Sequence, residues 1–202
     1  MPIKQGQIPQ ESITELKRSM GGEMNRNRRF TELSEEALGG APVLRFAHET
    51  FTLTPSDILG YVKPESTTSQ SWRYLVPGPQ GPSVAEVAQN TSKTEYSFSQ
   101  STSGLHSQLT GEALRWMHDG AELGDDTYEI RGLRIPALLI DALWLKNLSR
   151  ESADLYAVIQ PVKQVLAPKT LYKADDFFSA LRDMVKAKPA FDNSPVPGDQ
   201  NR

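Results

Sequence analysis

The sequence predicts an α+β fold, with a mainly antiparallel sheet, helices packed on one face and a helical N-terminal arm. Three observations lead to this prediction. Segments with strand composition occur before, between and after segments with helical periodicity, without the regular alternation of a doubly wound parallel sheet. Two strand-like segments flank a connector rich in Pro and Gly, as in a hairpin. A segment near the C-terminus has the apolar stripe of a helix that packs on a core.

Composition divides the 202 residues into a polar helical arm at 1–40, a single α+β domain at 41–188 and a flexible tail at 189–202. Hydrophobic residues account for 38% of the chain, which together with 14 Gly approaches the share of a globular protein. The formal net charge of −3 provides no global attraction to nucleic acid or to an anionic membrane. No apolar run approaches the length of a membrane span or resembles a secretion signal, so we expect a cytoplasmic protein.

The sequence lacks the residues that several classes of site require. Without Cys, the chain can form no disulfide and no zinc site with thiolate ligands. Neither the Gly-x-Gly-x-x-Gly nor the Gly-Lys-Ser/Thr fingerprint of phosphate-binding loops occurs. We therefore expect no cofactor, no bound metal and no membrane partner, and the net charge disfavours nucleic acid as a partner.

The N-terminal arm contains two predicted amphipathic helices. In the first, Ser12 and Glu15 have the spacing of a capping box, and Gly21-Gly22 ends the apolar stripe. The second extends from Thr31 to Leu38. Because stripes this narrow rarely stabilise an isolated helix, we expect the arm to pack on this chain's own core or on a partner. The candidate interaction residues are Ile13, Leu16, Met20, Arg28, Arg29 and Leu33.

The first half of the domain is predicted to be rich in strands. Residues 43–48 and 50–53 are enriched in branched and aromatic side chains, and Thr54-Pro55 after them is a typical helix start. Residues 72–76 and 83–88 form the predicted hairpin. Strict alternation over the following residues, 96–99, predicts a third strand.

The second half of the domain contains two predicted helices and one ambiguous segment. Residues 103–118 and 175–188 each have the apolar stripe of a helix packed on a core. Residues 128–130 and 155–159 are predicted to be short strands. Residues 133–145 are almost wholly apolar, which fits a buried helix or a buried strand pair, and their Ala and Leu content favours the helix.

The candidate catalytic residues are His106, Ser103 and His118. A hydroxyl nucleophile needs an imidazole base and an acid that orients it, and Asp119 or Asp141 would supply the acid. However, no Gly-x-Ser-x-Gly elbow occurs, and Ser103 precedes a predicted helix, where capping is the commoner role of a hydroxyl. His106 and His118 lie too far apart along one straight helix to share a metal ion.

Two charged regions are weaker candidates for a site. Residues 112–126 are acidic, but their spacing fails the calcium-loop pattern, so a solvated turn is the simpler interpretation. Arg26, Arg28 and Arg29 form a basic cluster in the arm, and glutamates of the same arm cancel its charge.

These observations favour a non-enzymatic protein that acts through self-association or a protein partner, using its arm and the surface of its α+β domain. One alternative is a small hydrolase that uses His106 or His118 with a nearby Ser or carboxylate. Another is a module that binds a small ligand between the hairpin at 72–88 and the helix that follows it.

Overall fold

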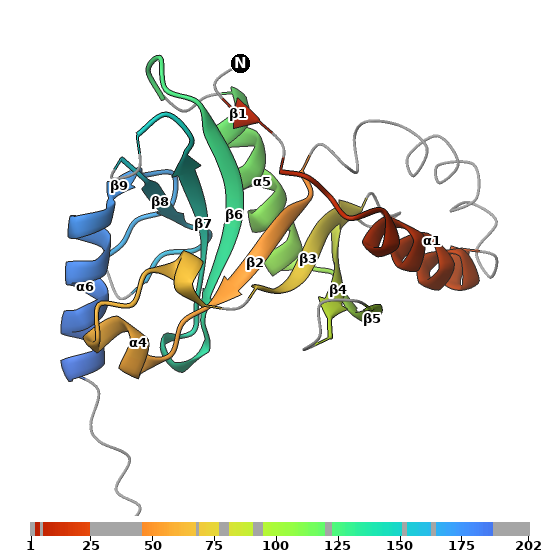
Figure 1. Ribbon diagram of the computed structural model, residues 1–202, viewed down its shortest axis with the longest axis horizontal. Helices are drawn as coiled ribbons and strands as arrows, with labels where there is room; N and C mark the ends of the chain where they lie inside the picture. The colour runs from red at the N-terminus through yellow and green to blue at the C-terminus, as the bar shows by residue number, and fades with distance from the viewer. Residues whose placement is uncertain are drawn as a thin grey trace, which may run out of the picture.

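The structure is a computed structural model that describes residues 3–4, 6–24, 46–67, 69–76, 81–90, 95–119, 123–150, 153–162 and 165–187. Within these ranges, residues 21–24, 69–70 and 118–119 are described by their backbone alone. The predicted α+β class and the mainly antiparallel sheet are confirmed (Figure 1). No helix in the described ranges is both long enough and apolar enough to cross a membrane.

Within the described ranges the sheet contains nine strands: β1 Ile3–Lys4, β2 His48–Thr52, β3 Ser69–Val76, β4 Ser83–Gln89, β5 Tyr96–Thr102, β6 Tyr128–Ile135, β7 Ile140–Asn147, β8 Leu155–Val158 and β9 Tyr172–Lys173. Their order across the sheet is β5-β4-β3-β2-β6-β7-β8-β9, and β1 pairs with the start of β6. β1 and β2 run parallel to β6, whereas the other neighbouring pairs are antiparallel.

The described helices are α1 Gln10–Met24, α4 Pro55–Leu59, α5 Leu105–Asp119 and α6 Ala174–Ala187, with short 3₁₀ turns η1 Pro64–Ser66 and η2 Pro136–Leu138. Two helix starts match the sequence prediction. Thr54 caps α4 in a capping box with Asp57, with Pro55 in the first turn. Asp175 and Asp176 occupy the first turn of α6, where the helix dipole favours negative charge.

Helices cover both faces of the sheet, whereas we expected them on one. Successive residues of a strand point to opposite faces. On β7, Trp144 packs in the same cluster as Phe177 of α6, whereas its neighbours Leu143 and Leu145 pack with Leu114 of α5. The two helices therefore lie on opposite sides of the central strands (Figure 1).

The first helix packs on the sheet of its own chain. Leu16 is fully buried and Met20 nearly so, in a cluster with Trp72 and Tyr74 of β3. Since Tyr74 and Leu75 point to opposite faces and Leu75 packs with α5, α1 lies on the face opposite α5. Of the two surfaces considered for this stripe, the chain's own core is the one that it covers.

Two details of α1 differ from the sequence prediction. The helix begins at Gln10, so Ser12 lies inside its first turn and its hydroxyl hydrogen-bonds to the Tyr74 hydroxyl at 2.7 Å. Glu15 accepts a hydrogen bond from the backbone N–H of Phe98 at 3.0 Å. The side chains that we expected to form a capping box therefore make tertiary contacts with β3 and β5 instead.

The apolar stretch at 133–145 forms a strand pair, so the favoured helix is wrong. β6 and β7 pair antiparallel along their whole length, and Pro136 begins a single 3₁₀ turn between them. Leu143 and Trp144 pack on opposite faces of the sheet, and both are buried. A strand covered on both faces loses the alternation of apolar and polar residues that would identify it.

The other helices and strands predicted within the described part of the domain are confirmed with small changes in their bounds. In the hairpin of β3 and β4, Trp72 pairs with Val87 and Tyr74 with Ala85, and β5 adds the third strand. α5 has the predicted position, although Leu105 at its start is exposed. The predicted helix at 31–38, the strand start at 43–45 and the tail at 189–202 lie outside the described residues.

Candidate functional site

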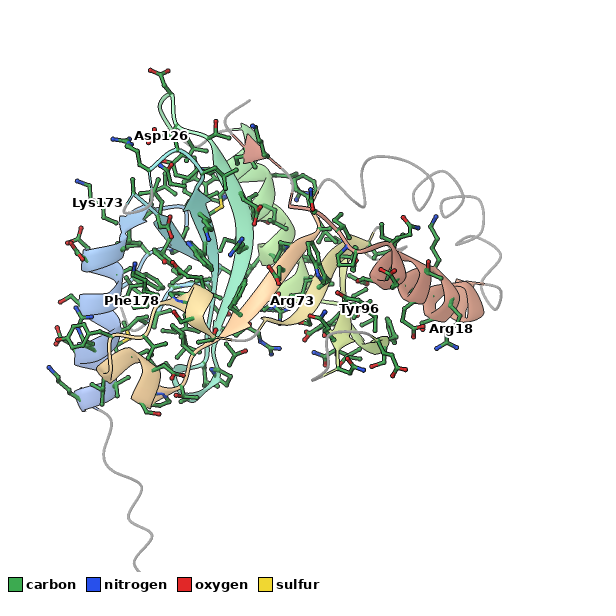
Figure 2. All side chains as sticks on the ribbon, in the orientation of Figure 1. Arg18, Arg73, Tyr96, Asp126, Lys173 and Phe178 are labelled. Atoms are coloured by element: carbon green, nitrogen blue, oxygen red, sulfur yellow. The ribbon has the colours of Figure 1, made fainter. Side chains whose placement is uncertain are left out.

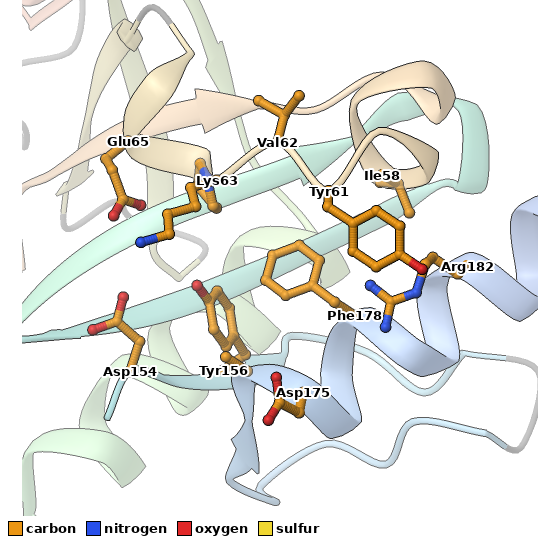
Figure 3. Close-up of a pocket in the computed structure, with 12 residues that line it drawn as sticks. Ile58, Tyr61, Val62, Lys63, Glu65, Asp154, Tyr156, Asp175, Phe178 and Arg182 are labelled. Atoms are coloured by element: carbon orange, nitrogen blue, oxygen red, sulfur yellow. The ribbon is translucent and has the colours of Figure 1, made fainter. Parts of the chain in front are cut away.

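A cavity of about 350 Å³ lies where the segment from α4 to η1 faces β8 and α6 (Figure 3). Aromatic side chains occupy its centre, and charged side chains stand toward its two ends. The lining residues are Ile58, Tyr61, Val62, Lys63, Pro64, Glu65, Asp154, Tyr156, Ala174, Asp175, Phe178 and Arg182.

Stacked aromatic rings form the base of this cavity. The rings of Trp144 and Tyr156 stack with centroids 6.2 Å apart, and Tyr156 stacks on Phe177 at 4.8 Å. Phe178 meets Tyr156 edge to face at 5.3 Å. Such pairs add roughly 0.5–1.5 kcal/mol beyond the burial of their surface, so the base of the cavity is preformed. Burial also raises the pKa of the Tyr156 hydroxyl, which keeps it protonated.

Tyr61 forms one wall of the cavity in an unfavourable backbone conformation. Its φ is 57°, in the left-handed region that costs a bulky residue about 1–2 kcal/mol. Its side chain is nevertheless 73% exposed, so the fold obtains little burial from this residue. The guanidinium carbon of Arg182 lies 4.6 Å from the centre of the Tyr61 ring, within cation–π range. The ring and the guanidinium together form the wall at the Arg182 end.

Lys63, Glu65 and Asp154 gather at the other end of the cavity (Figure 3). The carboxylate of Asp154 accepts hydrogen bonds from Trp144 Nε1 and from the backbone N–H of Asn147, each at 2.8 Å. Burial raises the pKa of Asp154, and the charge of Glu65 acts in the same direction. In the part of the chain that the structure describes, none of these three charged side chains takes part in an ion pair.

A second group of polar side chains lies on the α5 face of the sheet. Arg73 of β3 is buried in the middle of the molecule, in contrast to the exposed Arg18 on α1 (Figure 2). Arg73 Nε is 3.3 Å from Glu86 Oε2, and Arg73 Nη1 is 3.5 Å from Asp141 Oδ1. Arg134 contacts the same two carboxylates at 3.5 and 3.4 Å. Two arginines thus balance two carboxylates, which is the arrangement of a structural network.

The electrostatics of Glu86 agree with this structural role. Burial is the largest single influence and would raise the pKa of Glu86, but the positive charges of Arg73 and Arg134 and the hydrogen bonds to the carboxylate together outweigh burial and lower the pKa below its usual value. Gln100 Nε2 donates a further hydrogen bond to Glu86 Oε2 at 3.2 Å. Glu86 is therefore held as a carboxylate at neutral pH and is unsuited to donate a proton.

The structure brings His106 close to one of the two acids considered for it. His106 Nε2 lies 3.4 Å from Asp141 Oδ2, at the edge of the structural network. Ser103 is exposed, and no described hydroxyl hydrogen-bonds to the His106 ring. Ser107, four residues after Ser103 in the sequence, donates its hydroxyl hydrogen bond to the carbonyl of Thr102 at 2.5 Å. The side chain of His118 is outside the described part of the chain.

The candidate interaction residues are divided between two environments. Leu16 and Met20 are buried against β3 and β4, and Ile13 is half-buried, so in this conformation the stripe faces the chain itself. The other three, Arg28, Arg29 and Leu33, lie outside the described residues. In the acidic region, Asp126 hydrogen-bonds to Asn147 at 3.0 Å and pairs with Arg150. No group of three or more His, Asp or Glu suited to a metal ion occurs among the described residues.

Sequence reasoning missed the cavity and most of its lining. The ligand site considered as an alternative lay between the 72–88 hairpin and α5, where the structure places the network of Arg73 and Glu86. Tyr61, Val62 and Lys63 lie in a loop without periodicity, and Tyr156 and Phe178 on the other side of the cavity are about a hundred positions away. The one local signal was the run from Tyr61 to Glu65, which combines aromatic, cationic and anionic side chains directly after a short helix.

Comparison with known proteins gives no match for this chain to a protein-family model, to a curated protein or to a solved structure.

Proposed function

We propose that this protein is a binding module for a small organic ligand, which occupies the cavity between the α4–η1 segment, β8 and α6. One observation supports the proposal: a cavity of about 350 Å³ combines an aromatic base with charged side chains that have no ion-pair partner in the described chain. Sites for small molecules are typically about 300–1,000 Å³, largely apolar, and supplied with a few polar groups that orient the ligand.

The proposal retains a non-enzymatic role but replaces the protein partner with a small molecule. The hydrolase alternative has the pair of His106 and Asp141 in its favour. A hydroxyl nucleophile must be within hydrogen-bond reach of its base, and no described hydroxyl meets that condition at His106. The protein-interaction hypothesis that the sequence favoured loses Leu16 and Met20 as contact residues, since both are buried within the chain.

Tyr61 allows a clean test because the chain contains a matched control. Tyr61 and Leu139 both have left-handed φ values, 57° and 55°, and both have exposed side chains. Replacing either with Gly relieves the backbone conformation, so neither Tyr61→Gly nor Leu139→Gly should destabilise the fold by more than about 1 kcal/mol. Only Tyr61 lines the cavity.

The experiment is a fragment screen by ligand-observed NMR, using the wild-type protein and these two variants. We expect fragments that bind the wild type to bind Leu139→Gly equally well. Their affinity for Tyr61→Gly should fall at least about fivefold, because a cavity wall and its cation–π partner are lost. If no fragment binds at millimolar concentration, or if Tyr61→Gly binds as the wild type does, the proposed function is wrong.

A further inference from the structure

The Lys63 end of the cavity presents both signs of charge in a small space. Glu65 and Asp154 contribute two carboxylates and Lys63 one ammonium group, and the hydroxyl of Tyr156 points toward the same end (Figure 3). In the described chain, none of these charged groups is paired with another. A ligand ammonium group would satisfy the carboxylates, and a ligand carboxylate would satisfy Lys63 and the hydroxyl.

Asp154 is the best-oriented of these groups. Its two oxygens accept hydrogen bonds from Trp144 Nε1 and from the Asn147 backbone, so its position is set by β7. It is also half-buried, and Lys146 acts on it only through longer-range attraction. A half-buried carboxylate without a paired cation is unfavourable, and a bound ammonium group would supply the missing charge.

The space next to this charged end suits an aromatic ring. Phe178 lies in the middle of the cavity, between the Lys63 end and the wall made by Tyr61 and Arg182 (Figure 3). The edge-to-face contact of Phe178 with Tyr156 at 5.3 Å holds the Phe178 ring in place. A ligand ring packed on Phe178 would gain an aromatic contact and lie near the guanidinium of Arg182.

We propose that the ligand is a free α-amino acid with an aromatic side chain. Its ammonium group lies between Glu65 and Asp154, its carboxylate on Lys63, and its ring on Phe178. The ammonium and carboxylate groups of an α-amino acid are bonded to the same carbon. This arrangement matches a cavity that has both signs of charge at one end and aromatic surface beside them. This inference rests on the proposed ligand-binding function and specifies the chemistry of the ligand.

The test compares three probes that share one ring: L-phenylalanine, 2-phenylethylamine, which lacks the carboxylate, and 3-phenylpropionate, which lacks the ammonium group. Their affinities are measured by calorimetry for the wild type, Lys63→Gln and Glu65→Gln. Both side chains are exposed, so both variants should melt as the wild type does. Lys173→Gln, at an exposed lysine outside the cavity, is the control for a change of net charge.

We expect phenylalanine to bind at least about tenfold more tightly than either analogue, because it makes both sets of charged contacts. Lys63→Gln should weaken phenylalanine about fivefold without weakening 2-phenylethylamine, which has no carboxylate for Lys63. Glu65→Gln should weaken phenylalanine by a similar factor without weakening 3-phenylpropionate, which has no ammonium group for Glu65. Lys173→Gln should leave all three affinities unchanged.

The outcomes separate this inference from the function on which it rests. If an analogue with one charge binds as tightly as phenylalanine, the amino-acid ligand is wrong while the cavity remains a ligand site. The same conclusion follows if other fragments bind the cavity and all three probes fail. If neither these probes nor any fragment of the screen binds, the inference and the proposed function are both wrong.

Discussion

His48 should make the stability of this fold sensitive to mild acid. Its ring is buried on β2, and its Nδ1 donates a hydrogen bond to the carbonyl of Phe46 at 2.9 Å. Burial lowers the pKa of His48 from 6.5 to about 4, and the positive charge of Arg73 acts in the same direction. His48 therefore binds a proton less readily in the folded state than in the unfolded chain.

The size of the effect follows from the two pKa values. The contribution of His48 to stability is fully present above the unfolded value of 6.5 and is lost as the pH falls toward the folded value of about 4. Each pKa unit corresponds to about 1.36 kcal/mol, so the complete loss is about 3 kcal/mol. About 2 kcal/mol of it falls between pH 7 and pH 5, where ordinary carboxylates remain largely ionised.

The variant His48→Asn removes the titrating ring and keeps a side-chain N–H for the carbonyl of Phe46. It should cost roughly 1–2 kcal/mol at pH 7 through lost packing, and its free energy of unfolding should change little between pH 7 and pH 5. The control His106→Asn replaces a partly exposed imidazole and keeps His48, so it should still lose the roughly 2 kcal/mol that His48 contributes over this interval. Urea unfolding at several pH values measures the free energy of unfolding of the wild type and the two variants. The reasoning is refuted if His48→Asn still loses about 2 kcal/mol over this interval.

Two further predictions concern buried and surface charges. Arg73→Met should lower the free energy of unfolding in urea by about 3 kcal/mol, because it leaves the buried carboxylate of Glu86 without its main partner. Adding Glu86→Leu should recover most of this loss, and a double variant as unstable as Arg73→Met would contradict the pairing. Glu15→Gln should cost about 1 kcal/mol at pH 7, because hydrogen bonds from Arg18 and from the Phe98 backbone lower the pKa of Glu15 to about 2. This contribution is present above about pH 4.5 and is lost as the pH falls through about 2, so thermal melts of the two proteins should converge in acid.

The buried charge network and the lining of the proposed ligand site lie on opposite faces of the sheet. The network of Arg73, Glu86 and Asp141 lies on the α5 face, whereas Tyr156 and Phe178 belong to the core on the α6 face. Substitutions in the network should therefore change the free energy of unfolding with little effect on the shape of the cavity. Substitutions at the exposed walls of the cavity should change ligand binding with little effect on the free energy of unfolding.

Features that depend on neighbours in sequence were predictable from the sequence. Thr54 and Pro55 start a helix because a capping hydroxyl and a fixed φ act on adjacent residues. The ladder of β3 and β4 ends at the pair of Val76 and Ser83, next to a Pro-rich stretch of sequence, and proline lacks the N–H that a further ladder hydrogen bond would need. The stripe through Phe177, Leu181 and Met184 identifies the last helix for the same reason: the helical period is a local property.

Features that depend on partners far along the chain were decided by the tertiary structure. Residues 133–145 became strands because neighbouring elements bury them on both faces, which removes the alternation that would have identified them. Arg73 and Asp141 meet across 68 positions, and Tyr61 and Arg182 meet from opposite ends of the domain. The sequence by itself determined where most helices and strands form. Which faces they bury, and which charges and rings meet in a cavity, required the packed fold, because those contacts join residues that no local pattern relates.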